Sequence, residues 1–331
     1  MTEKALDVVC IGNAIVDVIA HADEEFLARH GMAKGAMQLI DDEAAHRLYA
    51  DLPPAIETSG GSAANTAAGL ASFGAAAGFI GKVADDVLGE VFTHDLRALG
   101  VEFQPLAPGA SAEGHRTGRC LIVVTPDAER TLNTYLGVSG LIAPDDVDAE
   151  LIARAAVVYG EGYLWDMPDA KKAILKGFET ARSFGARTAF TLSDSFCVDR
   201  HRAEFLELAE HHVDVLFANE PEICSLYETT SFDEAAAAVA GHCDIACLTR
   251  GASGATVVTP EGQIHVAARP VEQVVDTTGA GDLFAAGFLH GLTAGRPLED
   301  AARLGVLAAA EVIGHTGPRP AVSLADLARD V

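Results

Sequence analysis

Short apolar runs alternate along the chain with Ala-rich stretches in which apolar residues recur at helical spacing. In each stretch the apolar residues are followed by glycine or a polar residue: "DVVCIG", "GFIGKV", "AAVVYG", "TAFTLS", "VLFANE" and "IACLTRG". This alternation predicts an α/β fold in which a mostly parallel sheet is flanked by helices. Ligands of such sheets bind at the carboxyl ends of the strands, so the polar residues that follow each run are candidate site residues.

A second pattern of strands interrupts the first. "DVIAHA", "GAMQLID", "AIETSGG", "VEFQPL" and "GRCLIVVTP" have the alternation of strands that are buried on one side. We expect them to form a smaller sheet, a lid built from inserted segments at approximately residues 16–58 and 101–134. The 331 residues suffice for one large domain with such an excursion, so we treat 1–331 as a single domain.

The charge of the chain limits its partners. It contains 48 Asp and Glu against 23 Lys and Arg, a net charge of -25. Such a surface repels nucleic acid and anionic lipids, so we expect neither as a partner. A nucleotide can still bind where backbone N–H groups create a local anion site. The start, "MTEKALDVVCIG", has neither a signal-peptide pattern nor a membrane-spanning length of apolar residues, and we expect a cytoplasmic protein.

Three well-known motifs of α/β enzymes are absent. A Walker A loop is excluded because "GAAAGFIGKV" has the wrong glycine spacing and Val83 after its lysine. The dinucleotide fingerprint fails because "GAGDLF" has Phe284 in place of the third glycine. "GASGA" lacks the final glycine of the esterase elbow. These departures disfavour P-loop NTPases, NAD-dependent oxidoreductases and α/β-hydrolases.

The segment "DTTGAGDLFAAGFLHGL" has the features of a phosphate site. Gly279, Ala280 and Gly281 precede an apolar helical pattern, so their N–H groups should point out of the helix N-terminus and bind an anion. Asp282 follows in the first turn. A carboxylate beside a phosphate is repelled by it, unless the site needs a base for a hydroxyl that attacks phosphorus. A plain helix-dipole role for Asp282 remains the alternative.

Two long segments resemble the signatures of the ribokinase-like (PfkB) carbohydrate kinases. "GGSAANTAAGLASFGAAAGFIGKVADDVLGE" is similar to the first and "DTTGAGDLFAAGF" to the second, in the family's order. The resemblance implies a three-layer α/β/α fold with a β-sheet lid, ATP and Mg²⁺ as co-substrates, and phosphorylation of a hydroxymethyl group. It also implies that Asp282 is the general base and that residues 279–281 form the anion hole.

The resemblance assigns the acceptor site to residues near two turns. In "GNAIVD", Asn13 and Asp17 match residues that contact the acceptor, and a carboxylate can accept bonds from both hydroxyls of a diol. Gly60 and Gly61 match positions where the backbone approaches the sugar, and Asn65 matches an amide that bonds a hydroxyl. A solvated strand end for Asp17 and a tight turn for the two glycines are the alternatives.

The metal and nucleotide residues are also assigned by resemblance. In "NEPE", Asn219 and Glu222 match residues that hold the Mg²⁺ water shell, although the same letters suit a helix start. The nucleotide loop "LTRGASGA" implies three contacts with ATP, and a β-hairpin turn explains its glycines equally well: Thr249, Gly251 and Gly254.

Three further residues complete the set. Arg130 matches a lid arginine of adenosine kinases that reaches the phosphates, with a surface position as the alternative. Asp276 and Thr278 lie where many relatives bind a monovalent cation, which makes K⁺ a candidate cofactor.

Two details favour the adenosine kinase-like branch of the family. "LSDSF" resembles the "LSAPF" of adenosine kinases, which places Phe196 near the nucleoside, and "EGYLWDMP" aligns with a segment that supplies a ring against the base. This sequence has Leu164 where a closer match would have phenylalanine, so Tyr163 or Trp165 would have to stack on the base. Core positions for these aromatic residues remain the alternative.

We therefore expect an ATP-dependent kinase that phosphorylates the 5′-hydroxyl of adenosine or a related nucleoside. A sugar or sugar-acid kinase of the same family is the alternative acceptor assignment. A non-catalytic regulator would share the fold, but it would have no need of Asp282 beside an anion hole. The sequence leaves the choice between monomer and homodimer open.

Overall fold

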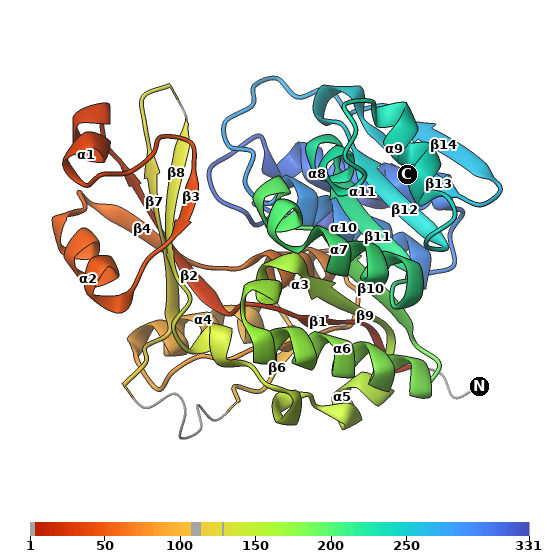
Figure 1. Cartoon of the computed structure of the whole chain (residues 1–331), viewed down its shortest axis with the longest axis horizontal. Helices are drawn as coiled ribbons and strands as arrows, with labels where there is room; N and C mark the ends of the chain where they lie inside the picture. Colours follow the sequence, from red (N-terminus) through yellow and green to blue (C-terminus); the bar gives the residue numbers. More distant parts are fainter. Residues whose placement is uncertain (1–3, 107–113, 128, 331) are drawn as a thin grey trace.

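A nine-stranded β-sheet forms the centre of the larger part of the molecule (Figure 1). The computed structural model describes residues 4–106, 114–127 and 129–330. The strand order is β14-β13-β12-β11-β10-β9-β1-β5-β6. The strands are β1 (Leu6–Ile11), β5 (Ala77–Ile80), β6 (Glu102–Phe103), β9 (Ala155–Glu161), β10 (Arg187–Thr191), β11 (Val215–Asn219), β12 (Ile245–Thr249), β13 (Ala255–Thr259) and β14 (Gly262–Val266). From β6 to β12 all neighbours are parallel, and β13 and β14 add an antiparallel hairpin at one edge.

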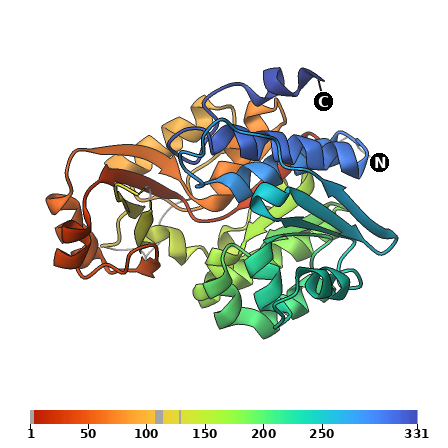
Figure 2. The same ribbon diagram turned by 90° about the horizontal axis from the view of Figure 1, so that it is seen from above.

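Helices cover both faces of this sheet because its strands are apolar on both sides. In β1, Val8 and Cys10 belong to one buried cluster, and Val9 and Ile11 belong to the other. Helices α5 to α9 pack on the second face, and α3, α4, α10 and α11 on the first, which gives three layers (Figure 2). No helix in the described part of the chain is long and apolar enough to span a bilayer.

The α-helices of these layers are α3 (Ser62–Ser72), α4 (Val87–Ala98), α5 (Ala149–Ala153), α6 (Pro168–Ser183), α7 (Ser195–His211), α8 (Glu220–Leu226), α9 (Phe232–Val239), α10 (Ala280–Thr293), α11 (Leu298–Val312) and α12 (Leu324–Leu327). Short 3₁₀ turns lie at η2 (Gly137–Leu141), η3 (Pro144–Asp146), η4 (Gly162–Asp166), η5 (Gly251–Ser253) and η6 (Ala328–Asp330). Most α-helices begin at a side-chain cap such as Asp86, Asp194 or Asn219.

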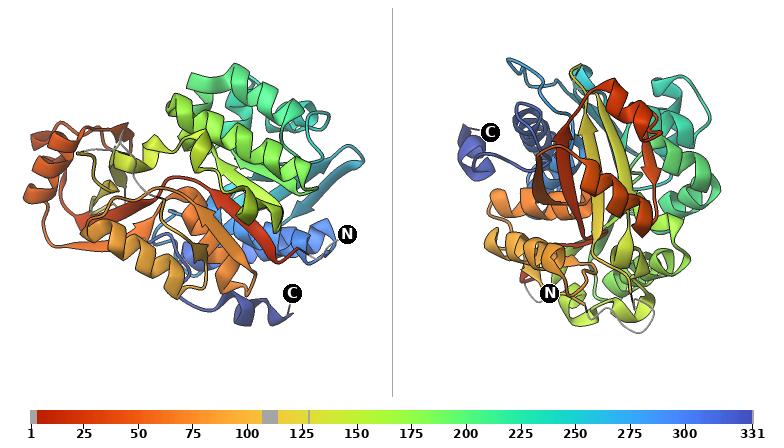
Figure 3. Two further views of the ribbon diagram at one scale, coloured as in Figure 1. Left: turned by 90° about the horizontal axis from the view of Figure 1, so that it is seen from below. Right: turned by 90° about the vertical axis from the view of Figure 1, so that its left-hand side faces the viewer.

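A five-stranded sheet of order β3-β8-β7-β2-β4 stands beside the three layers (Figure 3). Its elements are β2 (Ile15–His21), α1 (Glu24–Arg29), β3 (Met37–Leu39), α2 (Asp42–Asp51), β4 (Ala55–Gly60), β7 (Gly118–Val124) and β8 (Arg130–Tyr135). One face packs on α1 and α2 through Val18, Leu121 and Val123. The opposite face presents a second apolar cluster that contains Ile19, Cys120 and Ile122.

The prediction of a mostly parallel α/β sheet with a second, smaller sheet is confirmed, but one strand was assigned to the wrong sheet. "VEFQPL" contributes β6, which pairs with β5 in the large sheet. Phe103 of β6 is buried edge-on against Phe79 and Phe92, and this aromatic cluster fixes the strand there. The alternation of a two-residue strand does not reveal which sheet it joins. Residues 107–113 and 128 of the expected lid segment lie outside the described residues.

Candidate active site

A cavity of about 640 Å³ lies between the two sheets. Its floor is formed by the carboxyl ends of the parallel strands, represented by Asn13, Glu161 and Asn219, and by the start of α10. Its opposite wall comes from the small sheet, which contributes Ile122 and Leu132. The large sheet therefore places its ligand site where parallel α/β sheets generally do.

The turn before α10 has the backbone conformation of an anion site. Gly279 has a φ of +76° and caps the helix, and a Cβ there would lie 2.5 Å from the carbonyl oxygen of Pro318, so only glycine fits. Ala280, Gly281 and Asp282 form the first turn, whose N–H groups point out of the helix end. The Ala280 N–H also makes a long bond of 3.3 Å to Thr277 O. All four residues from 279 to 282 line the cavity.

Asp282 is held by two side chains from the start of α3. The Ser62 hydroxyl donates to Asp282 Oδ1 at 2.6 Å, and Asn65 Nδ2 donates to Oδ2 at 3.0 Å. Burial raises the pKa of Asp282, and the two hydrogen bonds oppose this rise. A fixed carboxylate of raised basicity beside an anion site has the properties of a general base.

The main chain passes between the large sheet and the small one at the residues that were predicted to bind the acceptor. β1 leads into β2 through Asn13, and β4 returns through Gly60 and Gly61 to α3. Gly61 has a φ of +96°, and a Cβ there would lie 2.2 Å from Asn13 O; a Cβ on Gly60 would lie 2.2 Å from Asp17 Oδ2. Of these residues, Gly60 alone is not part of the cavity lining. The two glycines therefore form a tight turn, and this turn lies next to the cavity.

Asp17 is buried in β2, so the alternative of a solvated strand end is wrong. Burial raises its pKa from 3.8 to about 7, although Arg130 and Arg319 lower it. The nearby carboxylates of Asp282 and Asp276 raise it further. A carboxyl group in this state titrates near neutral pH.

Glu161, at the end of β9, is a site residue that the motifs did not reveal. It is fully buried, and its Oε1 accepts from the backbone N–H of Asn13 at 2.9 Å and from Asn13 Nδ2 at 2.7 Å. Its Oε2 accepts from the N–H of Ala63 at 2.8 Å. Burial raises the pKa of Glu161 to about 7, although these bonds lower it. Because Ser139 donates to Asn13 Oδ1, the Asn13 amide is fixed from both sides.

Asn219 and Glu222 form a capping box at the start of α8. Asn219 Oδ1 accepts from the Glu222 N–H at 2.9 Å, and Glu222 accepts from the N–H and Nδ2 of Asn219 at 3.0 and 2.6 Å. Burial raises the pKa of Glu222 to about 7. The helix-start interpretation is correct, and both side chains also line the cavity. One carboxylate with free lone pairs suits a Mg²⁺ ion that keeps most of its waters and binds phosphates.

The nucleotide-loop residues lie at the far end of the cavity from β2. Thr249 ends β12, Gly251 starts the turn η5, and Gly254 leads into β13, so the β-hairpin interpretation is correct. All three nevertheless line the cavity. Gly254 has a φ of +89°, and a Cβ there would lie 2.1 Å from Val266 O. Val306 and Ile313, of α11 and its C-cap, add an apolar wall at this end.

Arg130 links the small sheet to the loop before α10. Its Nη1 donates to Asp276 Oδ1 at 2.9 Å, and both side chains are largely buried, so the alternative of a surface arginine is wrong. Asp276 Oδ1 also accepts from the N–H and hydroxyl of Thr278, and Oδ2 accepts from the Gly317 N–H. Thr278 lines the cavity, whereas Arg130 and Asp276 do not. The Asp276 carboxylate is therefore occupied by four donors at the place expected for a monovalent cation.

The fold and motifs of the chain match one protein family. Residues 5–324 match the pfkB family of carbohydrate kinases. The chain belongs to this family. An adenosine kinase from Sinorhizobium meliloti has 53% identity and a TM-score of 0.92, and the match covers 98% of this chain and 99% of that one. A probable sugar kinase from Rhizobium etli has 49% identity and a TM-score of 0.92, with 100% and 99% covered. An ATP-dependent ribose-1-phosphate kinase of Halopiger xanaduensis is 34% identical over 275 residues, 80% of this chain and 83% of that protein.

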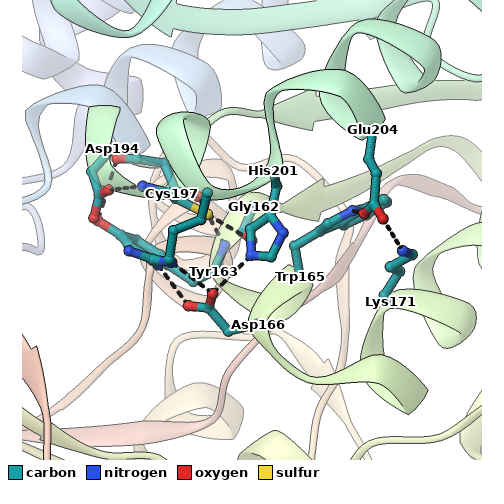
Figure 4. Close-up of polar contacts among 11 residues, drawn as sticks. Gly162, Tyr163, Trp165, Asp166, Lys171, Asp194, Cys197, His201 and Glu204 are labelled. Atoms are coloured by element: carbon teal, nitrogen blue, oxygen red, sulfur yellow. Dashed lines mark hydrogen bonds and ion pairs between the residues drawn. The ribbon is translucent and has the colours of Figure 1, made fainter. Parts of the chain in front are cut away.

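The three aromatic residues considered for the acceptor site lie in different environments, and Figure 4 shows two of them, Tyr163 and Trp165. Tyr163 lines the cavity and points toward Asp194. Trp165 is only 4% exposed, packs edge-on against Phe190 and Phe205, and donates from Nε1 to Glu204, so the alternative of a core position holds for this residue. The indole fills the space between η4 and α7.

Phe196, the other expected aromatic contact, lies apart from Tyr163. It is 62% exposed at the start of α7 and is not among the cavity residues. The preceding Asp194 caps α7 by accepting from the Cys197 N–H. This helix start leaves the Phe196 ring in solvent, and a place beside the acceptor remains an untested prediction.

The small sheet and the residue after it contribute apolar residues to the cavity that were not predicted: Ile15, Met37, Leu39, Ile122, Leu132 and Leu136. They belong to the small sheet or to the residue that follows it. Their sequence signal is ordinary strand alternation, which separates the two faces of a sheet but does not say what each face covers. Ser62, the donor to Asp282, stood within the first pfkB signature and was overlooked there.

Proposed function

We propose that this pfkB kinase transfers the γ-phosphoryl group of ATP to the 5′-hydroxyl of a ribonucleoside, with adenosine as the first candidate. The observation that carries this proposal is the apolar wall that the small sheet holds over Asp17 and Asn13. A flat base gains free energy by covering such a wall, whereas the hydroxyls of a bare sugar would lose their water there without new partners.

The charge of the lining supports the same acceptor. Among the described residues that line the cavity, Arg269 is the single Lys or Arg. It follows β14, and Ala268 beside it lies close to Gly254 at the nucleotide end. Arg130 and Arg319 act on Asp17 electrostatically, but neither lines the cavity. A sugar acid or a sugar phosphate would need a cation exposed in the cavity near Asp17. A neutral nucleoside needs none.

The catalytic steps follow from the contacts of Asp282. Asp282 removes the proton of the attacking hydroxyl as its oxygen forms a bond to phosphorus and the bond to the ADP oxygen breaks. The N–H groups of residues 279–281 stabilise the charge on the transferred group. Asp17 accepts the hydrogen bonds of the ribose 2′- and 3′-hydroxyls, which fixes the 5′-hydroxyl beside Asp282. Glu161 orients Asn13 and the start of α3.

A bound Mg²⁺ ion would supply positive charge that offsets the charge of the phosphates. Glu222 and Asn219 would hold its water shell, because their side chains line the cavity between the nucleotide loop and α10. Arg130 would supply a planar cation to the transferred phosphoryl group if its guanidinium left Asp276 and bound the phosphate instead. The identity of about 50% to both an adenosine kinase and a probable sugar kinase supports the kinase but leaves the acceptor to experiment.

The proposal is tested by an ADP-release assay at equal acceptor concentrations. The acceptors are adenosine, guanosine, inosine, ribose, ribose 1-phosphate, fructose and a 2-keto-3-deoxy sugar acid. We expect kcat/KM to be highest for a nucleoside and lower for 2′-deoxyadenosine than for adenosine, because one carboxylate oxygen of Asp17 then loses its partner. A higher kcat/KM for any sugar would replace the nucleoside assignment. ATP binding without turnover of any acceptor would support a regulatory protein.

A further inference from the structure

Arg319 lies in the segment between α11 and α12, where "GPRP" places it between two prolines. The segment is fixed on both sides of this residue. Upstream, the Gly317 N–H donates to Asp276 Oδ2 at 2.9 Å. Downstream, the Leu324 N–H donates to the hydroxyl of Ser72, on α3, at 3.0 Å. These anchors and the two prolines hold Arg319 beside the starts of α3 and α10.

The side chain of Arg319 contacts the amide that holds the proposed base. Arg319 Nε donates to Asn65 Oδ1 at 3.4 Å, and Asn65 Nδ2 donates to Asp282 Oδ2 at 3.0 Å. An amide has one end that accepts and one that donates. The guanidinium at Oδ1 therefore selects the orientation in which the nitrogen faces the carboxylate. The flipped amide would place oxygen against Asp282 and nitrogen against a cation, and both contacts are repulsive.

We propose that Arg319 is a positioning residue for phosphoryl transfer, which orients the Asn65 amide and thereby fixes the direction of the Asp282 carboxylate. This inference rests on the proposed role of Asp282 as general base. Arg319 itself does not contact the acceptor or ATP in this account, since it is not part of the cavity lining.

The surroundings of Arg319 argue against a role in stability alone. Burial lowers its pKa to about 10, and the carboxylates of Asp95 and Asp17 oppose this shift, so it remains charged at neutral pH. Its buried Nη2 has no hydrogen-bond partner among the described residues. A buried cation with an unbonded nitrogen costs free energy that an apolar side chain would not. The carboxylates of Asp95 and Asp17 offset part of this cost electrostatically, whereas Asn65 is the side chain to which Arg319 donates a hydrogen bond.

The test is a double-mutant cycle on kcat with Arg319→Met and Asn65→Ala. We expect Arg319→Met to lower kcat about 10- to 100-fold, the value of a hydrogen bond to a charged group, while KM for ATP stays within about twofold. Arg319→Lys retains a donor for Asn65 Oδ1 and should recover most of kcat. Because Arg319 acts through Asn65, the double variant should have the same kcat as Asn65→Ala alone.

Two results would overturn the inference: an Arg319→Met enzyme with the kcat of the wild type, or losses that multiply in the double variant. Thermal unfolding identifies a variant that fails to fold. In that case Arg319→Gln replaces Arg319→Met, because the glutamine amide can donate to Asn65 without the charge. A preserved kcat would then support the proposal that this residue orients the Asn65 amide. If Arg319→Gln lowers kcat strongly and does so equally in the Asn65→Ala enzyme, the proposal is refuted. Asp282→Asn serves as the reference: if it keeps its activity, the proposed base is wrong, whatever Arg319 does.

Discussion

Arg130 of β8, in the small sheet, and Asp276, in the loop before α10, form an ion pair of 2.9 Å. The pair joins the small sheet to the large α/β part of the molecule. Breaking one partner of such a buried pair costs about 2–5 kcal/mol. We expect Arg130→Met to raise KM for the acceptor and to lower kcat, together by at least tenfold in kcat/KM. Steady-state kinetics measures both.

The matched control for Arg130 is Lys34→Met. Lys34 pairs with Glu24 and Asp127, so its ion pairs lie within the small sheet and its helices and do not reach the large α/β part. These pairs are more exposed than the Arg130 pair and are expected to be worth at most about 1 kcal/mol each. Equal kinetics for the two variants would show that Arg130 does not connect the sheets functionally.

Asp282→Asn removes the proposed base and keeps the shape of the side chain. The asparagine oxygen can still accept from Ser62 or Asn65, so the fold should be retained. We expect kcat to fall roughly 10²- to 10⁴-fold, the range for a lost general base, with ATP affinity nearly unchanged. Calorimetric ATP titration and steady-state assays are the measurements. A kcat within a few-fold of the wild type would remove Asp282 from this role.

Gly279→Ala tests the close packing behind the anion turn. The new Cβ would lie 2.5 Å from Pro318 O at a φ of +76°, so the turn must move, and we expect a loss of about 1–3 kcal/mol in unfolding free energy together with most of kcat. Gly295→Ala is the control, since Gly295 has a φ of +71° but nothing within 4 Å. Urea unfolding should show a lower unfolding free energy for both variants. Steady-state assays should show a loss of kcat only for Gly279→Ala.

Trp165 and Tyr163 should respond differently to substitution. Trp165→Phe loses the bond to Glu204 and part of the packing on Phe190 and Phe205, so the unfolding free energy should fall by about 1–3 kcal/mol while the acceptor KM is unchanged. Tyr163→Leu changes the cavity wall and should raise that KM. Kinetics and urea unfolding of both variants decide. A large KM increase for Trp165→Phe would return the indole to the acceptor site.

The acceptor kinetics should depend on pH through Asp17. Only the ionised carboxylate accepts from both hydroxyls of a diol, and burial raises its pKa to about 7. We therefore expect kcat/KM for the acceptor to rise as the pH increases through about 7. The Asp17→Asn enzyme should have a lower kcat/KM at high pH, and its kcat/KM should no longer rise through about pH 7. An unchanged profile in the variant would assign the titration to another group.

The same shift predicts the direction of the stability change. Between pH 3.8 and about 7 the folded protein holds a proton on Asp17 that the unfolded chain has released. This contribution to stability is present at low pH and is lost as the pH rises through about 7. Glu161 and Glu222 behave in the same way. Urea unfolding of the free protein should give a lower free energy at pH 8 than at pH 5, and a smaller difference for Asp17→Asn.

The sequence predicted the parts of the molecule that depend on local pattern. Strands of the parallel sheet are continuous apolar runs because they are buried on both faces, and the glycine turn at Gly279 needs a conformation that few other residues adopt. The assignment of Phe103 to the wrong sheet and the open choice between a stacking and a core position for Trp165 share one cause. Each side chain is placed by aromatic partners distant in sequence, Phe79 and Phe92 for one, Phe190 and Phe205 for the other.

Glu161 could not have been recognised from its own neighbours. It ends a buried strand, where a polar residue is common, and its hydrogen bonds are made to Asn13, after the neighbouring strand β1, and to Ala63 on α3. The Arg319–Asn65–Asp282 chain of contacts likewise joins three segments that are more than 30 residues apart in sequence. Such relationships become visible only after the strands are paired.

The two walls of the cavity belong to different sheets. The turn at Gly279, Asp282 and Glu222 is carried by the large sheet and its helices, whereas Met37, Ile122 and Leu132 are carried by the small one. Apart from Asp17 and Arg130, side chains on the small sheet can therefore be exchanged without disturbing the groups proposed to transfer phosphate. A gene of this architecture could keep its chemistry while its acceptor changes, in line with the different acceptors in the names of two relatives, an adenosine kinase and a ribose-1-phosphate kinase.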